Sequence, residues 1–420
     1  MTRSVGPGYR WTVCALLFAV TTLNYVDRQV LGILAPLLQR ELHWSESQYG
    51  DVVSWFSGAY ALGFLVAGRA LDRVGVRRGM AAAVVAWSAA VMAHAVARTT
   101  AGFSAARAFL GLGESANFPA AIKAVAEWFP PAERALATGI FNAGTNTGAI
   151  VAPLLVPWIA LHWGWRWAFI ATGGLGFVWL LFWVALYPSP PGGAHAAPLP
   201  ERTVASGDAV PDAGGGVRWW HILARRQMWA VVVGKFMADP VWWFYLYWLP
   251  KFLDTRYGIK LSQVAVPLIV VYVIADVGSV TGGWLSGALI ARGWTVNRAR
   301  KTALLSMALL VLSTAFVPLI TSMWGAVLIV SVAAAAHQGW SANVYTLASD
   351  LFPRGAVATV IGIGGFAGAA GGWLFQRATG RILEATHANY GPIFAICGLA
   401  YITAWCLIHV LAPRLEPAEV

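Results

Sequence analysis

Twelve long apolar segments constrain the fold of this 420-residue chain more than any other feature. A helix that crosses a bilayer needs ~20 predominantly apolar residues, and each segment reaches about that length. Only 11% of the residues are charged, whereas a soluble domain carries ~25%, so a soluble enzyme is excluded. We therefore expect an all-α polytopic membrane protein with twelve transmembrane helices. The segments cover about residues 11–38, 51–71, 79–97, 101–125, 135–161, 168–187, 228–252, 264–291, 302–320, 323–348, 357–377 and 390–411.

The segments form two sets of six, separated by a stretch rich in Pro, Gly and Ala. This stretch contains SPPGGAHAAP and PDAGGG, a composition typical of a flexible linker. We expect an N-terminal six-helix bundle over 1–187, a linker over 188–227 and a C-terminal six-helix bundle over 228–420. The dipeptide Phe129-Pro130 recurs as Phe352-Pro353, displaced by 223 residues, and each is followed by a similar helix start. The halves are therefore expected to be pseudo-symmetric, an arrangement that supports alternating access.

The basic residues predict an orientation in the membrane rather than a nucleic-acid partner. The net charge is +11, but the Lys and Arg residues form no basic stripe. With the N-terminus inside, seventeen of these 29 residues fall on the cytoplasmic side and eight on the external side. Cytoplasmic loops carry such an excess, so we expect both termini and the linker in the cytoplasm. Cys14, Cys397 and Cys406 have neither disulfide nor metal-site spacing, and we expect no cofactor.

A Gly- and Arg-rich pattern, G-x-x-x-D-R-x-G-x-R, joins the second and third apolar segments. Glycines allow helix ends to approach and turn, and a carboxylate among arginines can hold one conformation and release it in another. We expect this cluster to act as a conformational latch; the alternative is an ordinary basic loop. The second half has Gly287 at the position that corresponds to the Asp, so a latch there is weaker or differently built. The expected latch residues are Gly68, Asp72, Arg73, Gly75 and Arg77.

Charged residues within the apolar segments are the main functional candidates. Each costs at least ~2.5–3.5 kcal/mol at the centre of a bilayer on insertion scales, so a charge placed there needs a reason. Arginine and lysine suit an anionic substrate, and carboxylates near them can exchange protons as access alternates. The alternative is that these charges pair and hold the bundle together. They are Asp27 and Arg28 in the first segment, Arg107 and Glu114 in the fourth, Lys235 and Asp239 in the seventh, and Asp276 in the eighth.

For the Lys235–Asp239 pair and for Asp276, the sequence leaves open whether the charges serve function or structure. Lys235 and Asp239 are spaced i,i+4 and can satisfy each other as an ion pair. Asp276 can be hidden in a hydrogen bond between helices. The polar residues Tyr60, Thr145, Asn146 and His337, with Trp340, are further candidates for substrate contact, with helix packing as the alternative. For the aromatic run 242–248, an interfacial belt or packing is favoured over a gate or a stacking platform.

Several of these motifs resemble those of a known family. The pattern from Gly68 to Arg77 resembles the hallmark of the major facilitator superfamily. Other motifs resemble its anion:cation symporter branch, and within it the bacterial hexuronate transporters. These motifs are Leu23–Arg28, Arg107–Pro119, Phe141–Gly148, Asp239–Tyr245 and Gly293–Arg298.

The resemblance implies proton-coupled import of hexuronates, glucuronate or galacturonate, by a carrier that is not an enzyme. It makes Arg28 the ligand of the substrate carboxylate, with Tyr25 and Tyr60 beside it. Asp27 and Glu114 would be the protonatable pair, and Arg107 would tune Glu114. Thr145 and Lys235 stand where aldonate-handling relatives often carry amides, and an added Lys235 suits a second anionic or strongly polar end of the substrate.

The expected setting is the inner membrane of a bacterium, with a monomer in the lipid bilayer. Three alternatives stay open. The first is an aldonate or other organic-anion symporter, and the second is an organic-anion exchanger, for example of organophosphates, which needs no protonatable carboxylate. The third is a transporter-like sensor, although the chain has no soluble signalling domain.

Overall fold

The computed structural model describes residues 8–129, 131–188, 219–352 and 354–416, and within them the secondary structure is helical. Together these helices give twelve spans, because α4 and α5 form the fourth and α11 and η1 the ninth. The five-residue α8 precedes the seventh. The helices are α1 (Tyr9–Leu42), α2 (Glu46–Val74), α3 (Val76–Ala93), α4 (Thr100–Glu114), α5 (Asn117–Trp128), α6 (Pro131–Trp163), α7 (Trp165–Leu186), α8 (Trp219–Leu223), α9 (Arg226–Tyr257), α10 (Ala265–Ala291), α11 (Val296–Leu312), η1 (Ser313–Leu319), α12 (Met323–Leu351), α13 (Arg354–Ala385) and α14 (Gly391–Leu411).

Eight helices in the described part of the chain are long and apolar enough to cross a membrane. Three of the other spans, formed by α1, by α4 with α5, and by α9, carry the intramembrane charge pairs found in the sequence. Charged side chains lower the mean hydropathy of a span, and they are tolerated at membrane depth where they face protein or a water-filled cavity. The less apolar helices are therefore the ones to search for function.

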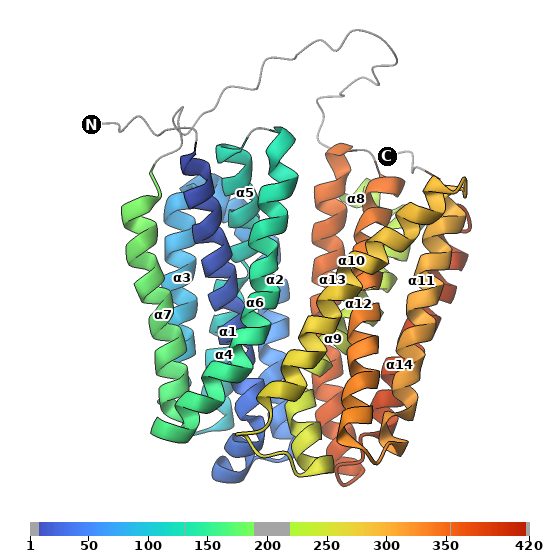
Figure 1. The fold of residues 1–420 in the computed structure, drawn as a ribbon. Helices are drawn as coiled ribbons and strands as arrows, with labels where there is room; N and C mark the ends of the chain where they lie inside the picture. The colour runs from blue at the N-terminus through green and yellow to red at the C-terminus, as the bar shows by residue number, and fades with distance from the viewer. Residues whose placement is uncertain (1–7, 130, 189–218, 353, 417–420) are drawn as a thin grey trace.

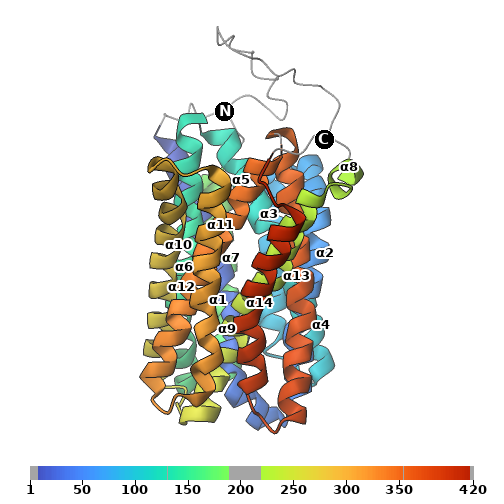
Figure 2. The same ribbon diagram turned by 90° about the vertical axis from the view of Figure 1, so that its right-hand side faces the viewer.

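The helices pack as two bundles, α1–α7 and α9–α14 (Figures 1 and 2). The start of α1 and the end of α14 lie at the same end of the molecule, here called the terminal end, and α8 lies there too (Figure 2). The opposite end is called the far end. Three helix pairs join the bundles along a seam: α2 with α13, α1 with α9, and α6 with α10. Most of the predicted linker, residues 189–218, lies outside the described residues.

The seam is closed towards the far end and separates towards the terminal end. A Cβ built on Gly50 of α2 would lie 3.0 Å from the Gly380 Cα of α13, so the two backbones touch there. Ser57, two turns further along α2, is fully buried. Leu65 continues the same face of α2, but it is 55% exposed, and nothing lies within 4 Å of a Cβ at Gly68. The bundles therefore diverge beyond the middle of α2.

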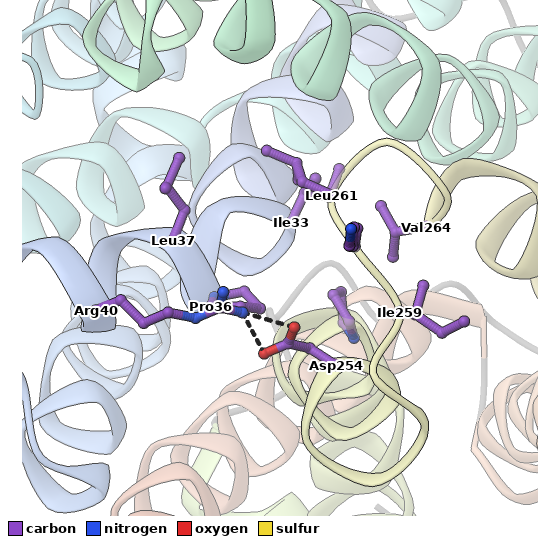
Figure 3. A pocket seen from close by; sticks show the side chains of 10 residues that line it. Ile33, Pro36, Leu37, Arg40, Asp254, Ile259, Leu261 and Val264 are labelled. Carbon is purple, nitrogen blue, oxygen red and sulfur yellow. Dashed lines mark hydrogen bonds and ion pairs between the residues drawn. The ribbon is translucent and has the colours of Figure 1, made fainter.

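Ion pairs connect the bundles at the far end. Arg40 of α1 binds Asp254 of α9 with both donor–acceptor distances at 2.6 Å, beside a cavity of about 110 Å³ (Figure 3). Arg377 of α13 donates to Asp51 of α2 at 2.7 Å. A third pair joins Lys251 to Glu46. These basic residues belong to the set that the charge tally assigns to the external side.

Two spans depart from the predicted continuous helices. The fourth breaks at Ser115 and Ala116, where Pro119 has no N–H to donate to the carbonyl four residues earlier. The ninth tightens into the 3₁₀ segment η1, which contains Pro318. Other boundaries follow local chemistry. Ser45 and Gln48 form a capping box at the start of α2, with the Gln48 N–H donating to the Ser45 hydroxyl.

Candidate functional site

An ion pair buried between α1 and α4 lies at the centre of the candidate site. Arg28 Nε and Nη2 donate to Glu114 Oε2 at 3.0 and 2.8 Å, and Nη2 also donates to the Asn24 side-chain oxygen at 3.3 Å. Arg28 is 4% exposed and Glu114 is fully buried. The other Glu114 oxygen has no hydrogen-bond partner among the described residues. One carboxylate oxygen thus occupies the edge of the guanidinium that a substrate carboxylate would need.

Four aromatic rings surround the Arg28 guanidinium. Its Cζ lies 4.7 Å from the Tyr25 ring centroid and 4.9 Å from that of Tyr60. The Phe56 and Trp243 centroids lie at 5.0 and 5.6 Å. Aromatic faces stabilise a cation by up to ~2 kcal/mol when it is desolvated. Because Trp243 belongs to α9, the charged centre lies on the seam and contacts both bundles.

Arg107 lies on the far-end side of this centre. Its Nη1 donates to the Arg28 carbonyl oxygen at 3.4 Å, and its Cζ lies 4.6 Å from the Phe56 centroid and 5.1 Å from that of Tyr247. The sequence makes Arg107 the partner of Glu114, but the hydrogen-bonded ion pair of Glu114 is with Arg28. Seven residues of helix separate Arg107 from Glu114 by about 10.5 Å along the axis, which leaves Arg28 better placed for direct contact.

Asp27 is buried on another side of α1. It is 2% exposed, and neither carboxylate oxygen has a hydrogen-bond partner among the described residues. The polar group beside it is the Thr172 hydroxyl of α7. Consecutive helix residues point about 100° apart, so Asp27 and Arg28 face different surroundings although they are neighbours in sequence.

Lys235 and Asp239 of α9 form the ion pair that their spacing predicts, with Nζ to Oδ2 at 2.9 Å. Lys235 Nζ also donates to the Tyr345 hydroxyl of α12 at 3.3 Å and lies 4.5 Å from that ring centroid. Trp243, one turn further along α9 than Asp239, has its ring centroid 5.6 Å from Arg28 Cζ. The two charged clusters therefore lie on opposite sides of the same part of the seam.

The aromatic run on α9 is internal rather than an interfacial belt. Trp243 is 8% exposed, and Phe244, Tyr245, Tyr247 and Trp248 are fully buried. The belt interpretation is therefore wrong for these residues. The choice between packing and a gate or stacking platform stays open, since Trp243 also lies against Arg28. Side chains four residues apart share a helix face, so Lys235, Asp239, Trp243 and Tyr247 form one stripe along the seam. This spacing could have singled out Trp243 and Tyr247 from the sequence, whereas nothing in the sequence points to Tyr345.

The remaining substrate candidates contact their own bundles. The His337 ring nitrogen Nδ1 lies 2.6 Å from the Tyr401 hydroxyl, and its ring stacks on Trp242 with centroids 5.2 Å apart. The Trp340 indole donates to the Gly234 carbonyl oxygen at 3.2 Å. Neither is brought to Arg28.

Thr145 and Asn146 lie at the crossing of α6 and α1. The Thr145 hydroxyl lies 2.8 Å from the Asn142 carbonyl oxygen and 3.2 Å from the Asn146 side-chain oxygen. The flanking Gly144 and Gly148 pack directly on the backbone of α1. This pair thus makes local contacts at a close helix crossing.

The expected latch joins α2 to α3 through Gly75, whose φ of +80° is a conformation that favours glycine. Arg77 donates to the Val184 carbonyl oxygen of α7 at 2.9 Å. Arg73 is exposed, Gly68 makes no close approach, and the Asp72 side chain lies outside the described part. In the second half, Arg300 pairs with Asp350 at 3.0 Å and donates to Ser286 at 2.7 Å. This polar cluster is built differently from the one expected around Asp72.

Comparisons with known proteins agree with this architecture. The hexuronate transporter of Escherichia coli K12 is 32% identical over 98% of this chain and 96% of its own length. The galacturonate transporter of Dickeya chrysanthemi is 34% identical over 76% of this chain and 94% of its own length. A D-galactonate transporter of Escherichia coli CFT073 is 29% identical over 98% and 96%.

Among solved structures, a bacterial homolog of the human lysosomal transporter Spinster, inward-facing and unoccupied, superposes with a TM-score of 0.75. It is 19% identical and covers 98% of this chain and 96% of its own, so it supports the fold alone. Residues 17–376 match the family model described as the Major Facilitator Superfamily. With twelve membrane-spanning helices in two bundles, this chain belongs to the major facilitator superfamily and is a transporter rather than an enzyme.

Proposed function

We propose that this transporter imports hexuronates, glucuronate and galacturonate, together with protons across the inner membrane of a bacterium. The observation that carries the proposal is the Arg28–Glu114 ion pair at the seam, with N–O distances of 3.0 and 2.8 Å. A substrate carboxylate and the Glu114 carboxylate compete for the same edge of one guanidinium. Protonation of Glu114 releases Arg28 to bind the anion, so binding of substrate and binding of a proton favour each other.

The aromatic rings and Asp27 complete this scheme. Tyr25 and Tyr60 lie against the Arg28 guanidinium, where their hydroxyls can bind sugar hydroxyls. Asp27 is buried without a hydrogen-bond partner among the described residues, and burying such a carboxylate costs least when it carries a proton. We assign Asp27 and Glu114 as the proton carriers. Arg107 positions the centre through the Arg28 carbonyl oxygen.

The proposal also fixes an orientation and a cycle. Both termini and the linker lie in the cytoplasm, the 1–187 and 228–420 bundles rock as units, and the cluster around Asp72 holds one of the two states. The seam is open at the terminal end, so this conformation faces the cytoplasm. After release of substrate and protons, Glu114 returns to Arg28 and neutralises it for the return step. A monomer suffices, because both bundles of one chain build the site.

The test is uptake of labelled glucuronate into proteoliposomes, with and without an inward proton gradient. We expect wild type to accumulate glucuronate only with the gradient. Glu114→Gln keeps Arg28 free of its competing charge but carries no titratable proton, so we expect exchange without gradient-driven accumulation. Glu41→Gln, which removes an exposed carboxylate paired with Arg166, is the matched control and should behave as wild type.

Other outcomes would replace the proposal. Accumulation of gluconate without glucuronate would identify an aldonate symporter. Full transport by Glu114→Gln and Asp27→Asn would identify an exchanger. Binding of the anion without transport by wild type would identify a sensor.

A further inference from the structure

The Lys235–Asp239 pair faces the seam as a neutral unit with one donor to spare. An ammonium group has three N–H donors. In Lys235 one lies toward Asp239 Oδ2 at 2.9 Å and a second toward the Tyr345 hydroxyl at 3.3 Å. Tyr345 is 45% exposed, so this polar cluster is not sealed within the C-terminal bundle. The third donor can bind one neutral oxygen of a ligand.

Glycines of α13 hold the pair in place. A Cβ built on Gly364 would lie 3.5 Å from Lys235 Cγ, and one on Gly368 would overlap the Asp239 carboxylate. Asp239 therefore lies directly over the bare backbone of α13 and cannot move towards it. The carboxylate stays beside the ammonium, and its side chain is 16% exposed.

The two charged clusters differ in what neutralises them. Arg28 lies across the seam from this pair: its Cζ is 5.6 Å from the Trp243 centroid, and Trp243 follows Asp239 by one turn of α9. In the proposed function Glu114 takes up a proton and gives up Arg28 to the substrate carboxylate, whereas Asp239 is held beside its lysine by the backbone of α13. A second substrate carboxylate at Lys235 would meet Asp239, a fixed like charge at close range. Only an uncharged end, a hydroxyl or carbonyl oxygen, fits beside the pair.

We propose that Asp239 is a specificity-determining residue that limits the transported sugar acid to one carboxylate. This inference rests on the proposed function in one respect, that the anion binds Arg28. It does not depend on which six-carbon acid is carried. Without the Asp239 charge, Lys235 becomes an unpaired buried cation, which favours a dicarboxylate at this site.

The experiment compares matched mono- and dicarboxylates. Purified protein in proteoliposomes is assayed for uptake of glucuronate, gluconate and glucarate, and in detergent for thermal stabilisation by the same three acids. Wild type should prefer a monocarboxylate. In Asp239→Asn the ratio of kcat/KM for the preferred monocarboxylate to that for glucarate should fall by about tenfold or more, since one like charge is removed from the second end.

Two variants separate charge from structure. Asp239→Glu keeps the charge and should keep the preference for one carboxylate. Glu416→Gln removes an exposed carboxylate of the same bundle, paired with Arg414 away from the seam, and should leave the ratio unchanged. If Glu416→Gln alters the ratio as much as Asp239→Asn does, the effect does not come from the charge at position 239 and the proposal fails.

The outcomes also distinguish this inference from the proposed function. Uptake of gluconate but not glucuronate, with glucarate gained in Asp239→Asn, overturns the hexuronate assignment and supports the role of Asp239. Glucuronate uptake with an unchanged ratio in Asp239→Asn supports the hexuronate assignment and overturns the role of Asp239. A wild type that prefers glucarate, or that neither carries nor is stabilised by any of the three acids, overturns the inference.

Discussion

Arg28 binds through the shape of its guanidinium as well as its charge. Two donors reach one carboxylate oxygen while four rings surround the planar group. Lysine keeps the charge but has neither the donor fork nor the flat face. We expect Arg28→Lys to lower kcat/KM for glucuronate by about 100-fold, since charge-assisted hydrogen bonds contribute ~1.5–3 kcal/mol each. Initial uptake rates over a range of substrate concentrations measure this.

The control at this scale is Arg40→Lys. Arg40 also makes two bonds to a carboxylate, but at the exposed far end, where a lysine can still pair with Asp254. It should keep kcat/KM within about threefold of wild type. An equally small loss in Arg28→Lys would show that only the charge at position 28 matters.

At the scale of elements, the contact of α2 with α13 sets the closure of the far end. A Cβ on Gly50 would lie 2.7 Å from the Gln376 carbonyl oxygen, so a larger residue forces the helices apart there. We expect Gly50→Val to open the far end and close the terminal end. Spin labels at positions 65 and 361, which are 55% and 38% exposed on α2 and α13, should move closer together.

Gly174→Val is the matched control for Gly50→Val. Gly174 lies on α7, away from the seam, and nothing lies within 4 Å of a Cβ there. Its label distances should match those of wild type. Exposed Cys406 is first replaced by Ser so that only the introduced cysteines are labelled. An unchanged distance in folded Gly50→Val would contradict the proposed rocking.

The helices and their contacts show which features could be predicted from the sequence and which could not. Spans and bundles could be predicted because hydropathy is local and averages over ~20 residues. The Lys235–Asp239 pair could be predicted because both residues share one turn of helix. The Arg28–Glu114 pair joins residues 86 apart in sequence, and helix periodicity does not relate different helices. For the same reason, the packing of glycines of α13 against Asp239 could be found only in three dimensions.

At the scale of the whole molecule, three ion pairs hold the far end closed. They are Arg40–Asp254, Lys251–Glu46 and Arg377–Asp51. Partly exposed pairs contribute about 0.2–1 kcal/mol each, so together they bias the two-state equilibrium by up to about 100-fold. We expect the triple variant Glu46→Gln, Asp51→Asn, Asp254→Asn to populate the conformation that is open at the far end. The same spin labels at positions 65 and 361 measure this population.

Salt gives an independent check on this bias. At 1 M the Debye length is ~3 Å, so exposed pairs are screened. High salt should shift the label distances of wild type towards those of the triple variant, and it should change the triple variant itself much less. An equal response of both proteins would assign closure to backbone packing rather than to charge.

The glycines at the open end of the seam have a consequence for how the helices pack in the opposite conformation. Gly68, Gly139, Gly283, Gly287, Gly362 and Gly365 lie on the four outer seam helices, α2, α6, α10 and α13, and a Cβ at any of them would meet nothing within 4 Å. A glycine inside a helix is about 1 kcal/mol less favourable than alanine. These six positions gain no packing in this conformation. We expect them to be the places where the same helices approach closely in the opposite conformation, because only glycine lets two backbones touch.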